Sequence, residues 1–139
     1  MKKVKRQKKD TGPATVLRFT EDHLWVRAEA DRAQIGISEQ GQHDLGEIIA
    51  VELPGIGDPI EMGEPFGELE SVRTVQELIA PITGTVRAVN GDLEDHPELA
   101  NEDPYQEGWL IEIEVADEAE LDELMGSEEY EEFLAEDAD

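Results

Sequence analysis

The chain has 139 residues, which is about the size of one domain and enough for a modest hydrophobic core. It has no cysteine, so disulfides, thiol chemistry and thiolate metal sites are excluded. A formal net charge of −25 at pH 7 disfavours binding to nucleic acids and anionic membranes, and favours basic partners. No apolar run approaches the roughly 18 residues of a membrane span. We therefore expect a cytoplasmic protein that binds neither nucleic acid nor membrane.

Positive charge is concentrated at the N-terminus. All five lysines lie at or before Lys9. Residues 1–14 have few apolar side chains to offset the entropy lost on ordering. We expect residues 1–14 to form a basic disordered tail and residues 15–139 to form a single domain.

The first half of that domain is predicted to be mostly β-structure. Gly, Pro and capping residues mark its boundaries. The predicted elements are a β-hairpin over 24–38, a short helix from the N-cap Ser38 to Gly46, a strand from Glu47 to Pro54, and turns at Gly57, Gly63 and Gly67.

The second half continues the pattern of short strands. The predicted elements are two strands over 74–90 broken at Ala80–Pro81, one helical turn with Pro97 at its first position, a last strand over 108–116, and two short acidic helices after Asp117. We predict a mainly β fold, a small sandwich or barrel with short helices and an acidic C-terminal helical segment, in which residues Glu47–Val115 form the sandwich.

Catalytic constellations are missing from the sequence. His23, His43 and His96 are far apart and lack the spacing of metal ligands, so surface or capping roles are expected for them. Trp25 and Trp109 are expected to pack in strands of the core. We therefore predict no catalytic residue and no metal site, and the protein is not expected to be an enzyme.

The stretch "ESVRTV" is predicted to be the tip of a β-hairpin, with Arg73 exposed in a tight turn. Its surroundings, "GDPIEMGEPFGELESVRTVQELIAPITGTV", resemble the lipoyl/biotinyl carrier (hammerhead) fold in the order of their turns. The stretches "FTEDHLWV", "IGISEQGQHDLGEIIAVELPGIGD", "LEDHPELANEDPYQEGWLIEIEV" and "ELDELM" are similar to the H proteins of the glycine cleavage system. The resemblance extends from about Phe19 to Leu134. One small departure is Leu24, where the family usually has an acid.

The resemblance implies a flattened β-sandwich that presents a lipoic acid arm on a lysine at the hairpin tip. In the family, this arm accepts an aminomethyl group from glycine decarboxylase and passes it to an aminomethyltransferase. Dihydrolipoyl dehydrogenase then reoxidises the arm. The carrier is thus a substrate of three enzymes, and an exposed tip on a rigid scaffold suits that role.

Arg73 occupies the position that the resemblance assigns to the lipoyl-lysine, with Glu70, Ser71, Val72 and Val75 around it. Formation of the amide requires a neutral amine, whereas a guanidinium is effectively always charged. No lysine follows Lys9, so a shift of the alignment by a few residues does not supply one. We expect no bound cofactor for this sequence, although lipoic acid is the cofactor of the family.

Several hypotheses remain open at this point. The chain is an H-protein homologue that docks on the same enzymes without lipoate, or an ordinary lipoyl carrier in which Arg73 is an engineered or erroneous substitution. A third hypothesis is a nucleic-acid or membrane adaptor that acts through the basic tail. Arg73 itself could hold a carboxylate or phosphate, or could simply pair with Glu70.

Overall fold

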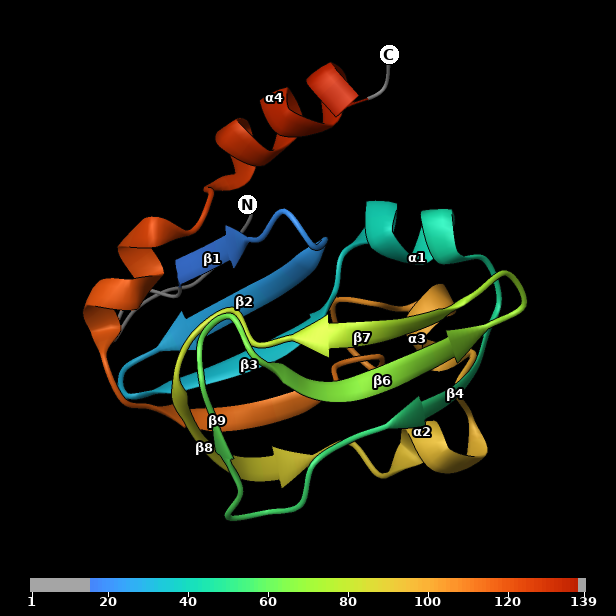
Figure 1. Cartoon of the computed structure of the whole chain (residues 1–139), viewed down its shortest axis with the longest axis horizontal. Helices are drawn as coiled ribbons and strands as arrows, with labels where there is room; N and C mark the ends of the chain where they lie inside the picture. Colours follow the sequence, from blue (N-terminus) through green and yellow to red (C-terminus); the bar gives the residue numbers. More distant parts are fainter. Residues whose placement is uncertain (1–15, 138–139) are drawn as a thin grey trace, which may run out of the picture.

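The computed structural model describes residues 16–137, which form two packed β-sheets with short helices at their ends (Figure 1). The strands are β1 (Val16–Phe19), β2 (Leu24–Glu29), β3 (Arg32–Ile37), β4 (Ile48–Glu52), β5 (Pro59–Ile60), β6 (Pro65–Ser71), β7 (Val75–Ile79), β8 (Gly84–Val89) and β9 (Ile111–Val115). The helices are α1 (Glu39–Leu45), α2 (Asp92–Asp95), α3 (Leu99–Glu102) and α4 (Ser127–Asp137), with a 3₁₀ helix, η1 (Glu118–Glu123). The predicted mainly β class is confirmed.

A six-stranded sheet and a three-stranded sheet make up the sandwich. The large sheet has the order β1-β2-β3-β9-β8-β5, and the small sheet has the order β4-β6-β7. All strand pairs are antiparallel. In Figure 1 the small sheet lies in front of the large one, and the loop between β6 and β7 projects at one end beside α1.

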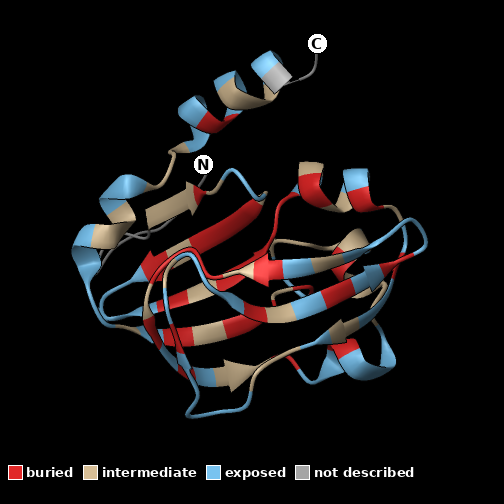
Figure 2. Cartoon of the chain, in the orientation of Figure 1, coloured by how far each residue is buried: buried red, intermediate tan, exposed pale blue. Residues whose placement is uncertain are grey.

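The main core fills the space between the two sheets. Fully buried side chains come from both layers, among them Ile35 and Ile113 from the large sheet and Leu69 from the small sheet. Figure 2 shows that buried residues line the strands, while the outer positions are exposed. Each such side chain contributes roughly 1.5–3 kcal/mol relative to an exposed one, so this core holds the β6–β7 hairpin against the large sheet.

A second cluster, consisting mainly of aromatic residues, attaches the C-terminal segment. Trp25 is fully buried, and its Nε1 donates to the carbonyl oxygen of Pro104 at 2.9 Å. Phe19 stacks on Tyr130 of α4, with ring centroids 4.4 Å apart. Backbone hydrogen bonds of 2.7 and 2.9 Å also join Phe19 to Met125. The contacts of Phe19 fix the start of α4 on β1.

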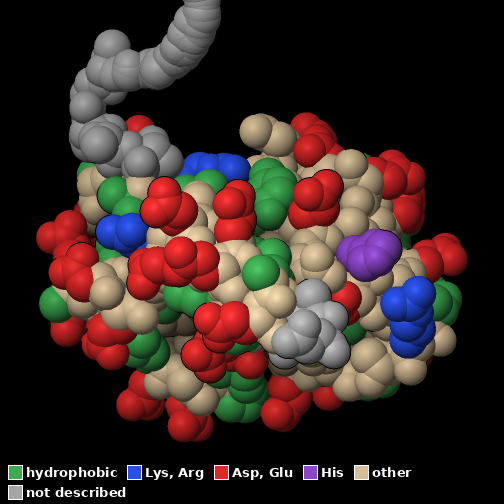
Figure 3. Space-filling model, turned by 90° about the horizontal axis from the view of Figure 1, so that it is seen from above, with side chains coloured by type: hydrophobic (Ala, Val, Ile, Leu, Met, Phe, Trp, Pro, Cys, Tyr) green, Lys and Arg blue, Asp and Glu red, His purple; other side chains and the backbone are tan. Residues whose placement is uncertain are grey.

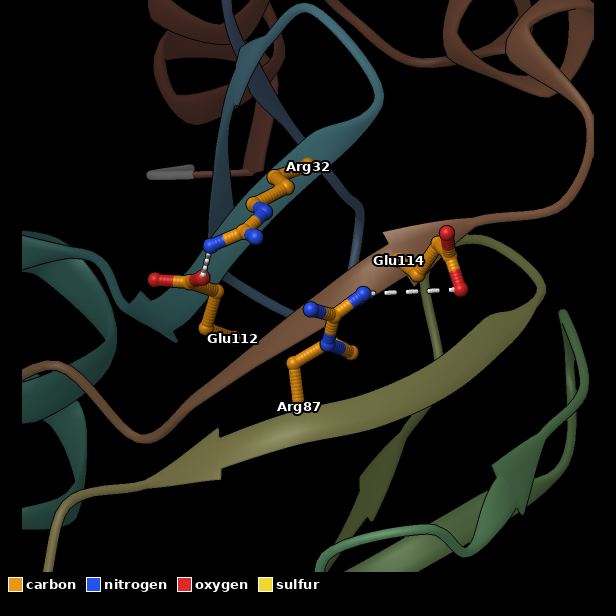
Figure 4. A network of polar contacts seen from close by, with 4 residues as sticks. All are labelled: Arg32, Arg87, Glu112 and Glu114. Carbon is orange, nitrogen blue, oxygen red and sulfur yellow. Dashed lines mark hydrogen bonds and ion pairs between the residues drawn. The ribbon is translucent and has the colours of Figure 1, made fainter.

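The outer face of the large sheet is held by polar contacts between neighbouring strands. Arg32 contacts Glu112 at 3.3 Å, and Arg87 contacts Glu114 at 3.6 Å (Figure 4). Exposed pairs of this kind contribute up to about 1 kcal/mol each. These arginines have local structural partners, and neither lies in the small sheet.

Two predicted boundaries of the sandwich are wrong. The sandwich does not begin at Glu47, because β1, β2 and β3 form half of the large sheet. Gly67 does not form a turn but lies inside β6, where it is paired with Leu78 of β7. A side chain at Gly67 would overlap the carbonyl oxygen of Glu52 on β4. The glycine is therefore needed for close approach of two strands rather than for a turn.

Two details of the helices and last strand also differ from prediction. Pro97 does not begin a helix but lies between α2 and α3, which have four residues each. Trp109 precedes the last strand, which begins at Ile111. The predicted N-cap Ser38, the helix end at Gly46 and the break at Ala80–Pro81 are confirmed.

The predicted basic tail, residues 1–14, lies outside the described residues. Within residues 16–137, no helix is both long and apolar enough to cross a membrane. Acidic side chains are spread over the whole face shown in Figure 3.

Candidate functional site

The candidate site is the tip of the β6–β7 hairpin. Glu70 of β6 is paired with Val75 of β7, and the backbone N–H of Ser71 donates to the carbonyl oxygen of Thr74 at 2.8 Å. The turn between the strands therefore consists of Val72, Arg73 and Thr74, all of which are exposed. The predicted placement of Arg73 in a tight, exposed turn is confirmed.

The side chain of Ser71 holds the backbone of this turn. It is one of the few buried polar residues, with 6% of its surface exposed. Its Oγ accepts hydrogen bonds from the backbone N–H groups of Arg73 and Thr74, both at 3.2 Å. The same hydroxyl donates to the carbonyl oxygen of Thr74 at 3.3 Å. None of these bonds involves the side chain at position 73, so they can form with another side chain at that position.

The guanidinium of Arg73 turns toward helix α1. Its Nη1 donates to the carbonyl oxygen of Asp44 at 2.8 Å and to that of His43 at 3.3 Å. Both carbonyls belong to the last turn of α1, which has no intrahelical partners for its final acceptors. A cation at this end is also favoured by the helix dipole. Arg73 is thus a C-terminal cap of α1, and no ion pair joins it to Glu70 within the described part of the chain.

Gly46 makes this approach possible. It has φ = 80° and ψ = −158°, a conformation that is essentially restricted to glycine. A Cβ atom at this position would lie 3.1 Å from Nε of Arg73. The sequence predicted Gly46 as the end of α1, but its contact with Arg73 was missed because the two residues are far apart in the sequence.

Apolar side chains are exposed around the tip. Val72 and Val75 are 60% and 57% exposed, and Ile49 at the start of β4 is 45% exposed. The backbone joins these positions, because the N–H of Val72 donates to the carbonyl oxygen of Glu47 at 2.9 Å. Behind them, Glu52, Glu68 and Glu77 are paired across the three strands of the small sheet. We call the surface formed by Ile49, Val72, Val75 and these three glutamates the hairpin face.

Adjacent carboxylates of like charge weaken a sheet. The glutamates of the hairpin face are all exposed, and Glu68 is directly opposite both Glu52 and Glu77. Their repulsion would be relieved by contact with a basic surface. The apolar residues beside them supply area that such a contact can bury.

Two hollows flank the tip. One, of about 450 Å³, lies on the Arg73 side of α1, and its lining includes Glu47, Glu98 and Glu102. The other, of about 190 Å³, is lined by Thr74 of the tip and by Leu24. Leu24, the residue that departs from the family pattern, is buried in β2. An apolar side chain there fits a position that is almost entirely covered.

The three histidines are not brought together. Nδ1 of His23 lies 2.8 Å from the hydroxyl of Tyr130, and Nδ1 of His96 lies 3.2 Å from a carboxylate oxygen of Glu98. His43 is in the last turn of α1. Among residues 16–137, His, Asp and Glu form no group of three or more that could hold a metal ion.

The geometry defines a class of protein: a two-sheet β-sandwich that presents one residue on an exposed, rigidly braced hairpin tip. The sequence model of the glycine cleavage H-protein matches residues 17–137. The chain is 52% identical over 120 residues to the glycine cleavage system H protein of Brevibacillus brevis, covering 86% of this chain and 95% of that one. It is 50% identical over 121 residues to the H protein of Bacillus subtilis, covering 87% and 95% of the two chains.

A solved structure gives the same result. The crystal structure of a glycine cleavage system H protein from Mycobacterium marinum superposes with a TM-score of 0.76 and 33% identity, over 82% of this chain and 92% of that chain. The chain therefore belongs to the glycine cleavage H-protein family, which consists of carriers rather than enzymes.

Proposed function

We propose that this H-protein homologue docks on the enzymes of glycine cleavage without carrying lipoate at its hairpin tip. The observation that carries the proposal is Arg73, an arginine in the exposed turn where the family resemblance places the lipoyl-lysine. A guanidinium keeps its charge and does not attack an activated acyl group. No lysine lies between Asp10 and Asp139, so the hairpin offers no other amine.

The hairpin face supports the docking part of the proposal. Its exposed apolar residues surround the tip, and its row of glutamates is suited to a basic partner surface. By family resemblance the partners are glycine decarboxylase, aminomethyltransferase and dihydrolipoyl dehydrogenase, in the cytoplasm. Lipoic acid, the family's cofactor, has no attachment point at residue 73.

A second candidate function is that of an ordinary lipoyl carrier in which Arg73 is an engineered or erroneous substitution. The hydrogen bonds of Ser71 favour it, because they would shape the same tip around a lysine. The match to 95% of the length of named H proteins also favours it. Under this alternative, only the nucleophile at position 73 has been lost.

A competition assay tests the docking proposal. The unmodified chain is added to a reconstituted glycine cleavage system that depends on a limiting amount of lipoylated H protein from a relative. We expect the chain to slow glycine cleavage, and an excess of the lipoylated carrier to restore the rate. Absence of inhibition at a large excess of the chain would contradict docking.

A matched pair of variants locates the contact. Val75→Asp places a charge in the hairpin face, whereas Ile56→Asp places one on another exposed apolar residue, in the loop beyond the other end of β4. We expect Val75→Asp to lose inhibition and Ile56→Asp to keep it. Equal inhibition by both variants would show that the hairpin face is not the contact.

A further inference from the structure

Helix α1 is too short to be stable by itself. It has seven residues, whereas isolated helices shorter than about 12 residues are marginal in water. Its stability must therefore come from contacts at its ends and on its buried face. Those end contacts come from distant parts of the chain. The hydroxyl of Tyr105 accepts the backbone N–H of Glu39 at 3.0 Å, and Asn101 donates to the carbonyl oxygen of Gly46 at 2.9 Å. Two further contacts come from α4 and from the hairpin tip.

Tyr130 of α4 holds the N-terminal end. The N-cap Ser38 is completely buried, and its Oγ accepts the backbone N–H of Gly41 at 3.0 Å. The hydroxyl of Tyr130 lies 2.7 Å from the same Oγ and 2.8 Å from Nδ1 of His23. The N-cap is thus fixed by a side chain 92 positions away in the sequence.

Arg73 holds the C-terminal end through the carbonyl oxygens of His43 and Asp44. The connection to the tip continues beyond the helix. Glu47, two residues after α1, accepts a hydrogen bond from the backbone N–H of Val72 at 2.9 Å. Loosening of the last turn of α1 would therefore release the Arg73 side chain and weaken a backbone anchor of the turn, which Asn101 also holds through Gly46 and Ile48.

We propose that α1 couples the C-terminal helix to the hairpin tip, with Tyr130 as the clamp at its N-terminus and Arg73 as the clamp at its C-terminus. Helix formation is cooperative, so loss of either clamp shifts the whole helix toward frayed states. Both clamps bias one equilibrium, which is the physical requirement for coupling between separate sites. A partner group that binds the Arg73 guanidinium would remove it from the end of α1 and weaken the contact of Tyr130 with Ser38. In the opposite direction, displacement of α4 would release the hairpin tip from α1.

The cavity between α1 and α4 fits this arrangement. It has a volume of about 550 Å³, and its lining includes Glu39 and His43 of α1 together with Tyr130 and Leu134 of α4. The two helices thus face each other across an open space and are joined at the N-cap by the Tyr130 hydroxyl. A change in the docking of α4 acts directly on the first turn of α1.

Amide hydrogen exchange of the full-length chain tests the proposal. The reporters for α1 are the amides of Gly41, Gln42 and Gly46, and the reporter for the tip is the amide of Val72; all four are hydrogen-bonded. Arg73→Gln removes the C-terminal clamp at an exposed position, so the fold is retained. We expect exchange to rise about two- to fivefold at Gly46 and Val72, and to rise also at Gly41, at the far end of the helix.

Tyr130→Phe tests the opposite direction. It removes one buried hydroxyl, and we expect exchange to rise about two- to tenfold at Gly41 and to rise measurably at Val72. Arg73→Lys should restore most of the protection, because an ammonium can also cap the helix. Arg87→Gln, which breaks an exposed pair on the large sheet, is the control and should change none of these amides.

The outcomes distinguish coupling through α1 from two independent effects at its two ends. If Arg73→Gln alters only Gly46 and Val72, and Tyr130→Phe alters only Gly41 and Gln42, the proposal is overturned. The same conclusion follows if Arg73→Lys protects no better than Arg73→Gln. Propagation in both directions, with rescue by lysine, supports it.

Discussion

Nη1 of Arg73 lies 2.8 Å from the carbonyl oxygen of Asp44, although the two residues are 29 positions apart in the chain. The hairpin tip of this protein is therefore fastened to the neighbouring helix by its own side chain. A residue that carries a swinging arm must leave the surface, whereas Arg73 is held against it. This contact gives the arginine a structural role that is independent of lipoate.

Gly46→Ala should disturb this contact most directly. Alanine would be forced into a backbone conformation that is essentially limited to glycine, and its Cβ would lie 3.1 Å from Nε of Arg73. We expect the free energy of unfolding to fall by about 1–3 kcal/mol in urea titrations, with an unchanged m-value.

Gly91→Ala is the matched control. Gly91 has φ = −65°, and no atom lies within 4 Å of a Cβ placed there. Its stability should stay the same or rise by up to about 1 kcal/mol. A loss of equal size in both variants would contradict the special role of Gly46.

Gly36→Ala tests the packing of Trp25 in the large sheet. Gly36 is the cross-strand partner of Trp25, and a Cβ atom at position 36 would overlap the buried indole ring. We expect a loss of about 1–3 kcal/mol in the free energy of unfolding, because the completely buried ring would have to shift to make room. Tryptophan fluorescence should shift at the same time. A neutral effect on both measurements would show that the ring is less tightly held than the structure indicates.

Alkaline pH should weaken the attachment of α4. Burial raises the pKa of Tyr130 above its ordinary value of 10.0, although the hydrogen bond with Ser38 acts in the opposite direction. The folded state therefore favours the protonated phenol. This contribution to stability is fully present below about pH 10 and is lost as the pH rises through the raised pKa.

Urea titrations between pH 8 and 11 check this prediction. We expect the stability of the wild-type chain to fall more steeply above pH 10 than that of Tyr130→Phe, which has no proton to lose at that position. Tyr105→Phe removes one of the lesser causes that raise the pKa of Tyr130 but keeps its burial, so its curve should lie closer to the wild type than to Tyr130→Phe. Parallel curves for the wild type and Tyr130→Phe would contradict the prediction.

The order of elements around the tip could be predicted from local signals. Ser38 and Gly46 carry capping signals for α1, and alternation in the sequence around Arg73 predicts the hairpin. Predictions failed where a residue's role depends on a distant strand. Gly67 is of a residue type common in turns, but glycine is needed there because the carbonyl oxygen of Glu52 lies close beside it. The strand β1 has only four residues, too few to show an alternating pattern.

The contacts that define the candidate site could not be predicted for the same reason. Arg73 finds its acceptors 29 and 30 positions away, and Tyr130 reaches Ser38 across 92 positions. These distances are set by how α1 and α4 pack on the sandwich. Sequence patterns identified the exposed arginine, but not the helix end that it caps.

Deletion of residues 1–14 tests the predicted division of the chain. These residues are basic and have few apolar side chains, so they offer little to a folded core. We expect the Tm of the shortened chain to match that of the full chain at moderate salt. A large decrease in Tm that disappears at high salt would show instead that the tail stabilises the acidic body by charge.

Intact-mass spectrometry after incubation with lipoate, ATP and a lipoate ligase tests the central claim most directly. The wild-type chain should keep its unmodified mass, because Arg73 offers no neutral amine. Arg73→Lys should gain one lipoyl group, because the backbone of the tip is shaped by Ser71 rather than by residue 73. A wild-type chain that gains a lipoyl group would contradict the claim that this protein lacks an attachment point.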